Sequence, residues 1–295
     1  MHIRFYFKKR LKLKMIILGL CFLFSTVSLS YLALCFQKDN SNQNNQDAVK
    51  LPVIMYHLVL KNPGTKNKFI ISEATFEEDL KYINENGYTT ILVKDLIDYT
   101  EGKCDLPSKP ILLTFDDGAY NNYLYAFPLA KKYNSKFVFS PICRECERYS
   151  EISDENPTYA HANWNHIREM SDSGLVEIQN HTYDMHSNKK SRIGCTKKSG
   201  ESKEEYTSKL TSDLKKAQEL IKEKSGIEPT AFFYPFGACS ECSDEIIRNI
   251  GFKATFLCES KLNYITKNSD CLFKLHRFLR PPGVSSKSFF STFEK

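Results

Sequence analysis

The chain has 295 residues, of which 41% are hydrophobic and 26% charged, so it can build the core of one large domain or two small ones. Its formal net charge is +6, and the first fourteen residues carry six cations and no acid. The rest of the chain is therefore neutral overall. That balance argues against a nucleic-acid-binding protein, because such proteins need a basic surface.

The N-terminal region predicts membrane attachment. A basic segment, residues 1–14, is followed by Met15–Phe36, which has no charge and is long enough to cross a bilayer with its cationic flank in the cytoplasm. No small-x-small cleavage site follows, which favours an anchor over a cleaved or lipoprotein signal. A polar linker at residues 37–50 then leads to a folded domain at 51–295. We expect a single-pass membrane protein with this domain outside the cell, or a secreted or lipid-anchored protein if the signal is cleaved.

Eight cysteines lie outside the apolar segment, and four of them form the C-x-x-C pairs Cys143–Cys146 and Cys239–Cys242. An even number in an exported domain permits disulfides without requiring them. A Cys₄ zinc site is disfavoured because the two pairs lie too far apart for a zinc ribbon. A redox motif is disfavoured because neither pair is expected to open a helix. We expect local disulfides or free thiols.

From Leu51 onward, β-favouring runs alternate with helical patterns. A capping box at Thr75–Glu78 predicts the start of the first helix, and Asn86-Gly87 predicts its end. The expected strands are Leu51–Tyr56, Tyr88–Val93, Ile111–Phe115, Lys136–Ser140, Leu175–Gln179, Ala231–Tyr234, Phe252–Leu257 and Leu272–Leu279. The expected later helices are Asn122–Tyr133, Trp164–Ser171, Glu204–Lys224 and Asp244–Asn249. The alternation predicts an α/β domain with a parallel sheet, open or closed into a barrel, and chemistry at the carboxyl ends of its strands.

Two acidic residues, Asp116 and Asp117, directly follow the strand Ile111–Phe115. Adjacent carboxylates at a strand end point in different directions, so one can bind a metal while the other faces a substrate. A simple Asp-Asp-Gly turn explains this tripeptide equally well on its own.

Two histidines, His181 and His186, follow the strand Leu175–Gln179 and strengthen the functional interpretation. Two imidazoles and one carboxylate leave open positions on a divalent ion, as in catalytic rather than structural sites.

Two further strand ends carry candidate residues. His57 closes the first strand and is either a general acid or a structural residue. Tyr234, Pro235, Phe236 and Gly237 close another strand, where Pro and Gly impose a fixed turn. Its backbone N–H groups can face the site, or the segment is only a tight connection.

Together these four elements resemble the polysaccharide deacetylase family, also described by the NodB homology domain, over Leu51–Gly283. Thr114–Gly118 matches the first motif of that family. The pair His181 and His186 matches the second, with the histidines five positions apart instead of the usual four. This spacing and the Met-Tyr-His end of the first strand resemble the branch of poly-N-acetylglucosamine deacetylases.

The third motif, Tyr234–Gly237, lacks the leading Arg of the commoner form. Arg277 resembles a late Arg of the same branch that takes its place. His57 is then expected to be the general acid, because the usual terminal acid motif has no clean counterpart in this chain. His276 is the alternative candidate.

The resemblance implies a distorted, TIM-like (β/α) barrel of about seven strands. It implies a divalent ion, Zn²⁺ or alternatively Co²⁺ or Ni²⁺, held by Asp117, His181 and His186. Asp116 would be the base, paired with Arg277. The Tyr234–Gly237 turn, and above all a backbone N–H near Phe236, would bind substrate and the oxyanion.

The implied activity is removal of N-acetyl groups from an N-acetylglucosamine-containing cell-surface polysaccharide, either peptidoglycan or poly-N-acetylglucosamine. The expected partners are this glycan and, through the N-terminal segment, the membrane, and we expect a monomer that binds no nucleic acid. Two alternatives stay open: an O-acetyl esterase acting on a xylan-type glycan, and an inactive glycan-binding surface protein.

Overall fold

The computed structural model describes residues 48–64, 67–189 and 191–294. The basic segment 1–14, the apolar segment 15–36 and residues 37–47 of the linker lie outside this part. No helix within the described ranges is long and apolar enough to span a bilayer. The compact unit begins at Val49, slightly before the expected boundary, because β1 (Val49–Leu51) pairs with β13 (Asn263–Ile265).

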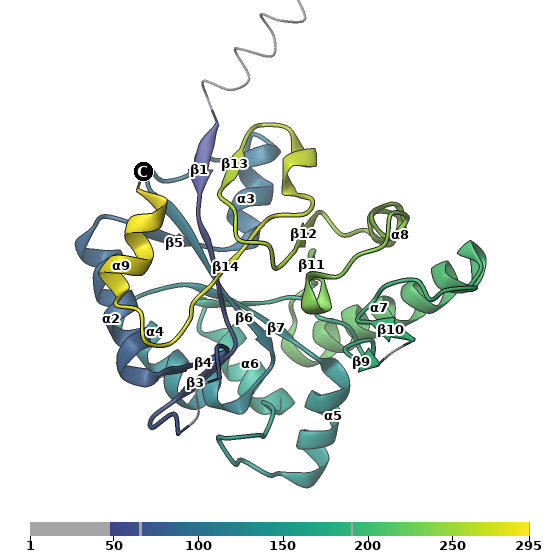
Figure 1. The fold of residues 1–295 in the computed structure, drawn as a ribbon, viewed down its shortest axis with the longest axis horizontal. Coiled ribbons are helices and arrows are strands. Elements are labelled where there is room, and N and C mark those ends of the chain that lie inside the picture. Colours follow the sequence, from purple (N-terminus) through teal and green to yellow (C-terminus); the bar gives the residue numbers. More distant parts are fainter. Residues whose placement is uncertain (1–47, 65–66, 190, 295) are drawn as a thin grey trace, which may run out of the picture. The chain divides into compact units, whose positions relative to one another are not determined.

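Parallel strands form the centre of the domain (Figure 1). The main sheet has the order β14-β2-β6-β7-β8, all parallel, and β5 pairs with the first part of β6. These strands are β2 (Val53–Tyr56), β5 (Thr89–Ile91), β6 (Pro110–Asp117), β7 (Phe137–Pro141), β8 (Val176–Ile178) and β14 (Phe278–Leu279). A second parallel pair consists of β11 (Ala231–Phe233) and β12 (Ala254–Phe256).

Two isolated bridges connect the sheets. Asn180, just after β8, pairs with Phe232 of β11, and Phe256 of β12 pairs with Leu275, just before β14. The described parallel strands therefore run in a closed circuit through β2, β6, β7, β8, β11, β12 and β14. This confirms the expected α/β fold and its distorted, barrel-like form.

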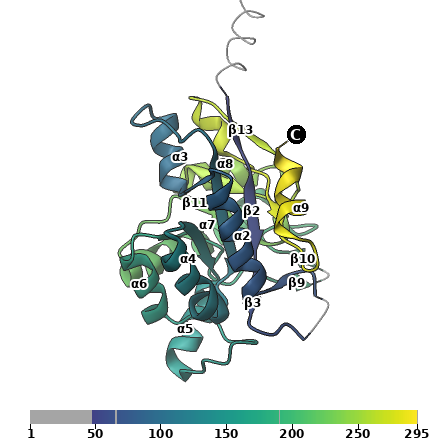
Figure 2. The same cartoon turned by 90° about the vertical axis from the view of Figure 1, so that its left-hand side faces the viewer.

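Helices surround these strands, and α2, α4 and α6 cover one side together (Figure 2). The helices are α2 (Glu73–Glu85), α3 (Val93–Thr100), α4 (Phe127–Tyr133), α5 (Cys143–Ile152), α6 (Trp164–Asp172), α7 (Lys203–Ser225), α8 (Ser243–Ile250) and α9 (Ser286–Phe290). Short elements are β3 (Leu58–Leu60), β4 (Ile70–Ser72), β9 (Asn188–Lys189), β10 (Arg192–Ile193), the π-turn η1 (Asn122–Ala126) and the 3₁₀ turns η2 (Pro235–Gly237), η3 (Ser269–Leu272) and η4 (Ser291–Phe293).

The alternation of side chains along β6 decides where the acidic residues point. Ile111, Leu113 and Phe115 pack into the core cluster under the helices, whereas Leu112 belongs to the cluster shared with residues of β2, β7, β11 and β12. Successive side chains of a strand face opposite sides, so Asp116 lies on the Leu112 side, inside the barrel.

A buried ion pair ties the C-terminal segment to the first strand. Asp79 of α2 accepts hydrogen bonds from Arg280 Nε at 2.9 Å, from the Tyr56 hydroxyl at 3.1 Å and from Ser286 Oγ at 2.6 Å. Asp79 and Arg280 are both excluded from solvent. Burial opposes ionisation and raises the pKa of Asp79, while the hydrogen bonds from Arg280 counteract that rise. The cluster fixes the end of β2, from which His57 projects.

Several boundaries differ from the sequence prediction. The first helix begins at Glu73, because the Ser72 side chain, and not Thr75, caps it by accepting the Thr75 N–H at 3.0 Å. Helices α3, α5 and α9 were not predicted. Only Phe278–Leu279 of the expected last strand pairs as β14, because Leu272 ends a 3₁₀ turn and Lys274 has a left-handed φ of 64°.

The first C-x-x-C pair opens α5, contrary to the prediction. Cys143 and Cys146 are buried in the core, and burial raises the pKa of both thiols, so neither is a reactive thiolate. All eight cysteines of the described part are free. The structure thus has the free thiols that the sequence allowed.

Candidate metal centre and active site

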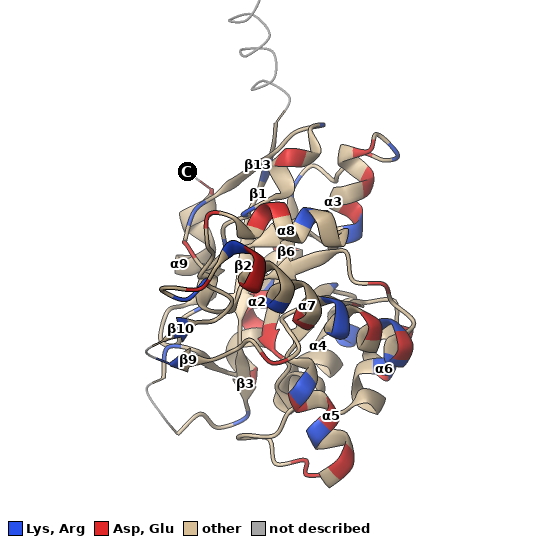
Figure 3. Ribbon diagram, turned by 90° about the vertical axis from the view of Figure 1, so that its right-hand side faces the viewer, with Lys and Arg blue, Asp and Glu red and all other residues tan. Residues whose placement is uncertain are grey.

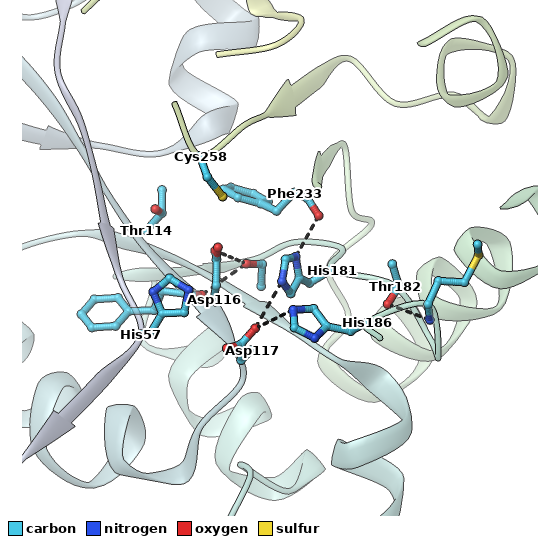
Figure 4. A network of polar contacts seen from close by, with 12 residues as sticks. His57, Thr114, Asp116, Asp117, His181, Thr182, His186, Phe233 and Cys258 are labelled. Atoms are coloured by element: carbon cyan, nitrogen blue, oxygen red, sulfur yellow. Dashed lines mark hydrogen bonds and ion pairs between the residues drawn. The ribbon is translucent and has the colours of Figure 1, made fainter. Parts of the chain in front are cut away.

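Residues from separate strand ends come together at one edge of the barrel. Figure 4 shows Asp116 and Asp117 from β6, His57 from the end of β2, and His181 and His186 beyond β8, all directed toward one region. Asp117 has a left-handed φ of 69°, which turns its side chain away from the regular alternation of β6. The two acidic neighbours therefore point differently, as the sequence predicted.

Asp117, His181 and His186 form a compact set of ligand atoms. Asp117 Oδ1 lies 3.3 Å from His181 Nε2 and 3.2 Å from His186 Nε2, and the three ligand atoms lie within 4.8 Å of one another. Burial opposes ionisation of Asp117, but the two rings outweigh it and hold the pKa of this carboxyl well below its usual range.

The His181 ring is oriented by a backbone group. Its Nδ1 lies 2.8 Å from the Phe233 carbonyl, which can only accept, so Nδ1 carries the proton. In the neutral form of the ring, Nε2 then carries no proton and presents its lone pair toward Asp117. Metal-binding histidines commonly have such an outer hydrogen bond.

These residues fit a divalent cation. Asp117 Oδ1 is buried and has no hydrogen-bond partner among the described residues, although two ring nitrogens lie near it. A buried carboxylate oxygen without a hydrogen-bond partner is unfavourable unless positive charge lies beside it. A cation held by all three side chains would supply that charge.

Asp116 is held by Arg277 at the centre of the site. Arg277 Nη1 donates to Asp116 Oδ1 and Nη2 to Oδ2, both at 2.7 Å, and Ser140 Oγ donates to Oδ1 at 3.0 Å. Burial opposes ionisation of Asp116, but attraction to Arg277 outweighs it and lowers the pKa of this carboxyl to about 2. The predicted pairing of Asp116 with Arg277 is confirmed.

His57 lies beside Asp116 in the same cluster (Figure 4). Its ring packs on Phe69 with 4.7 Å between ring centroids, and its Nδ1 is buried without a hydrogen-bond partner in the described part of the chain. Burial lowers the pKa of His57, and the carboxylates of Asp116 and Asp117 only partly offset that effect. The ring is therefore neutral at pH 7 and has one nitrogen free for proton transfer.

The Tyr234–Gly237 turn meets the site through Phe236. Phe236 is 46% exposed, and the centroid of its ring lies 4.5 Å from that of the His186 ring. Its backbone has a left-handed φ of 59°. Gly237 is required beside it, because a Cβ there would lie 2.6 Å from the Cys258 backbone nitrogen.

The other predicted residues lie apart from this cluster. The Tyr234 hydroxyl bonds with Ser243 at 3.0 Å and Asp244 at 2.9 Å, so this buried side chain belongs to the packing around α8. His276 Nδ1 lies 3.3 Å from Glu259. His57 is thus the better placed of the two candidate acids.

Comparison with known proteins places the chain in a family. Residues 103–255, just over half of the chain, match the family described as polysaccharide deacetylase. The chain belongs to this family. Polysaccharide deacetylases are in general metal dependent, which agrees with the Asp-His-His cluster.

Known polysaccharide deacetylases resemble the chain over most of its length. The poly-β-1,6-N-acetyl-D-glucosamine N-deacetylase of Escherichia coli (strain K12) is 24% identical over 254 residues. That alignment covers 80% of this chain but only 37% of the relative, so the chain spans little more than a third of that protein's length.

Two solved structures extend the comparison. The de-N-acetylase of Aggregatibacter actinomycetemcomitans has a TM-score of 0.69 at 25% identity, covering 83% of this chain and 98% of that one. IcaB from Ammonifex degensii has a TM-score of 0.66 at 28% identity, covering 83% and 96%.

The candidate site also includes groups that the sequence analysis did not single out. Ser140 is the penultimate residue of β7 and lies directly beside Asp116 in the sheet register, and its place near the end of a neighbouring strand was a usable signal. The Phe233 carbonyl is a backbone group, for which no residue type gives a signal. Asp213 of α7 accepts the backbone N–H groups of Tyr183 and Asp184 at 2.9 and 2.8 Å, which fixes the loop between the two histidines.

Proposed function

We propose that this chain is a metal-dependent hydrolase that removes N-acetyl groups from an N-acetylglucosamine-containing cell-surface polysaccharide, peptidoglycan or poly-N-acetylglucosamine. The observation that carries the proposal is the convergence of Asp117, His181 and His186 beside the buried pair of Asp116 and Arg277. Membership of the family and the N-deacetylase names of the Escherichia coli and Aggregatibacter relatives support it.

Zinc is the proposed ion, with Co²⁺ or Ni²⁺ as alternatives, because two imidazoles and one carboxylate suit a catalytic zinc site with an open position. When bound, such an ion supplies Lewis acidity, lowering the pKa of a water molecule and polarising an acetamide carbonyl. The Phe233 carbonyl would keep the His181 ring in the tautomer that presents Nε2 as a ligand.

Asp116 is the proposed base that accepts a proton from the attacking water. Its two hydrogen bonds from Arg277 keep it ionised across the physiological range, so the acceptor is always available. A carboxylate with a pKa of about 2 retains a proton only transiently. The proton must therefore move on during the reaction.

His57 is the proposed residue that returns a proton to the departing sugar amine. Because burial keeps the ring neutral at rest, it must first gain a proton and then give it up. The free buried Nδ1 provides an atom for this exchange. The neutral resting state agrees with a residue that first accepts a proton originating from the attacking water and then donates it to the departing amine.

The Phe236 N–H is the proposed donor to the developing oxyanion. Within the turn, the Gly237 N–H is used by the Tyr234 carbonyl at 2.8 Å and the Ala238 N–H by the Pro235 carbonyl at 3.1 Å. Pro235 has no N–H, so Phe236 is left as the available donor of the turn. A fixed backbone donor needs no reorganisation when negative charge develops.

We also propose that residues 15–36 anchor a monomeric enzyme in the cell membrane, with the catalytic domain outside. The absence of charge in that segment and the cations before it support this topology. Protease added to intact cells should remove the catalytic domain and leave the N-terminal segment with the membrane. Protection of the domain in intact cells would contradict the proposed orientation.

Acetate release by the purified full-length chain in neutral detergent tests the activity. The substrates are β-1,4- and β-1,6-linked N-acetylglucosamine oligomers and an O-acetylated xylan, with Zn²⁺, Co²⁺ or Ni²⁺ supplied in turn. We expect metal-dependent release from an N-acetylated oligomer that disappears in Asp116→Asn. Release from the xylan alone would establish the esterase alternative, and tight binding without release from any glycan would favour a glycan-binding protein.

A further inference from the structure

A groove borders the loop between the two candidate metal ligands. This cavity of about 620 Å³ is lined on one side by Tyr183, Asp184 and Met185, which connect His181 to His186. On the other side it is lined by α7, whose residues Ser208, Lys209, Ser212, Asp213 and Lys216 recur at helical spacing and so share one face. Arg192 and Lys198 complete the wall.

The groove is rich in positive charge. Four of its lining residues are cations, Arg192, Lys198, Lys209 and Lys216, against the two acids Asp184 and Asp213. Figure 3 marks such cations on α7 and on the β9–β10 hairpin. Like charges gathered around a cavity repel one another, so the arrangement is more favourable with an anion between them.

The nearby acids leave part of this charge unmatched. Buried Glu201 pairs with Arg192 at 2.6 Å and with Lys209 at 2.9 Å, so one carboxylate serves two cations. Burial opposes ionisation of Glu201, but hydrogen bonds from Lys209 and the Lys198 amide outweigh it and lower the pKa of this carboxyl to about 2. Arg192 and Lys209 are therefore held in place by the Glu201 carboxylate, which stays ionised.

The acids that line the groove are already engaged. Asp213 uses both oxygens for the backbone N–H groups of Tyr183 and Asp184, and Asp184 itself pairs with Arg144 at 2.6 Å. Within the described residues, no carboxylate lies at ion-pair distance from the ammonium group of Lys198 or Lys216. The Lys216 ammonium lies 3.4 Å from the centroid of the Tyr183 ring, at the edge of the loop that carries the metal ligands.

We propose that this groove, the Lys198–Lys216 groove, is a subsite for an anionic substituent of the glycan, a carboxylate or a phosphate, on a sugar near the one that is deacetylated. The inference rests on the proposed function and narrows its substrate class to an acidic cell-surface glycan. Lys198 and Lys216 bind the anion, and the hydroxyls of Ser208 and Ser212 are additional donors on the same wall. Arg192 and Lys209, tied to Glu201, hold the shape of the groove.

The test compares three oligosaccharides of equal length with the metal-loaded full-length chain in neutral detergent. One is a neutral β-1,4-linked N-acetylglucosamine oligomer, the second carries a lactyl ether carboxylate on alternate sugars, and the third carries 6-phosphate groups. We expect at least one acidic oligomer to have a KM about tenfold below that of the neutral one, the effect of one or two charge-assisted contacts. The lower of the two acidic KM values identifies carboxylate or phosphate as the preferred group.

Paired variants test the residues. Lys198→Ala combined with Lys216→Ala should raise the KM for the preferred acidic oligomer about tenfold and leave kcat and the neutral substrate unchanged. Lys222→Ala combined with Lys224→Ala removes the same charge farther along α7, where both lysines pair with glutamates, and should change the acidic KM less than about twofold. Equal KM values for all three substrates in the wild-type chain, or equal losses in both double variants, would overturn the proposal.

Direct binding separates this inference from the proposed activity. Calorimetric titration should show tighter binding of the preferred acidic oligomer than of the neutral one, and the Lys198→Ala, Lys216→Ala chain should lose this difference. If no substrate releases acetate but the difference remains, the activity is wrong and the subsite stands. If acetate is released and the titration shows no difference, the activity stands and the subsite is wrong.

Discussion

Asp116 and Arg277 are joined by two parallel hydrogen bonds of 2.7 Å, and both side chains are excluded from solvent. The planar guanidinium is the side chain that can hold both carboxylate oxygens in this way, and a lysine cannot. Arg277 also donates from Nε to the Leu257 carbonyl at 2.8 Å, which fixes its plane. The candidate base is thus ionised and immobilised by one residue.

Removal of Arg277 should destabilise the protein strongly. Arg277→Met leaves a buried carboxylate without its partner, and loss of one member of a buried pair costs about 3–5 kcal/mol. The matched control Glu228→Ala breaks the exposed pair with Lys222 and should cost below about 1 kcal/mol. Urea unfolding of the two variants measures both values, and equal midpoints would contradict the role of the buried pair.

The same pair should give stability a defined pH dependence. The pKa of Asp116 is lowered by folding, so the carboxylate's contribution is present above its ordinary pKa of 3.8 and is lost as pH falls toward about 2. Arg277→Lys keeps a charge but not the two parallel bonds, and we expect a weaker loss between these pH values. Unfolding free energies of both chains across this range provide the measurement. A wild-type chain no more dependent on pH than Arg277→Lys would contradict the assignment.

Loss of a candidate ligand should abolish metal binding. His186→Ala removes one of three ligand atoms, and we expect the content of bound zinc after dialysis to fall from about one ion per chain to nearly none. His166→Ala is the matched control, because His166 packs against the Tyr123 ring at 4.3 Å and is not part of the ligand set. Elemental analysis measures the zinc content of both variants. Full zinc retention in His186→Ala would exclude this ligand set.

The pH profile of kcat/KM should report the neutral state of His57. Burial lowers the pKa of this ring below 6.5, so the neutral form predominates above that pH. We expect kcat/KM at saturating zinc to fall only as pH drops below 6.5, and His57→Gln to lower kcat by about 10²- to 10⁴-fold and remove this limb. A limb that persists in His57→Gln would assign it to another group.

Gly237 offers a test of the turn beside the site. Gly237→Ala would place a Cβ 2.6 Å from the Cys258 nitrogen at a φ of +66°, whereas Gly87→Ala has a similar φ of +72° and open space. The Gly87 variant should cost about 1–2 kcal/mol from backbone strain alone. The Gly237 variant should cost more and lower acetate release, since Phe236 must move. Unfolding and activity assays compare the two, and equal effects would argue against a close contact.

The sequence by itself determined the fold class, the strands that carry the site, and Asp116, Asp117, His181 and His186 as candidates. These features are local. Buried strands have continuous apolar runs, and polar residues just after them can be read without knowing what the strands contact. The family motifs depend on the same short segments, so the sequence was sufficient to select them.

Only the tertiary structure decided which groups surround those candidates. The Phe233 carbonyl orients His181, Ser140 donates to Asp116, and the Tyr234 hydroxyl bonds in the packing around α8. Helix α3 was missed because short helices have weak local signals and are stabilised by packing. Whether a ring is buried, and hence the pKa of His57, depends on side chains brought together from distant segments. Closure of the barrel supplies that proximity, which no pattern along the chain contains.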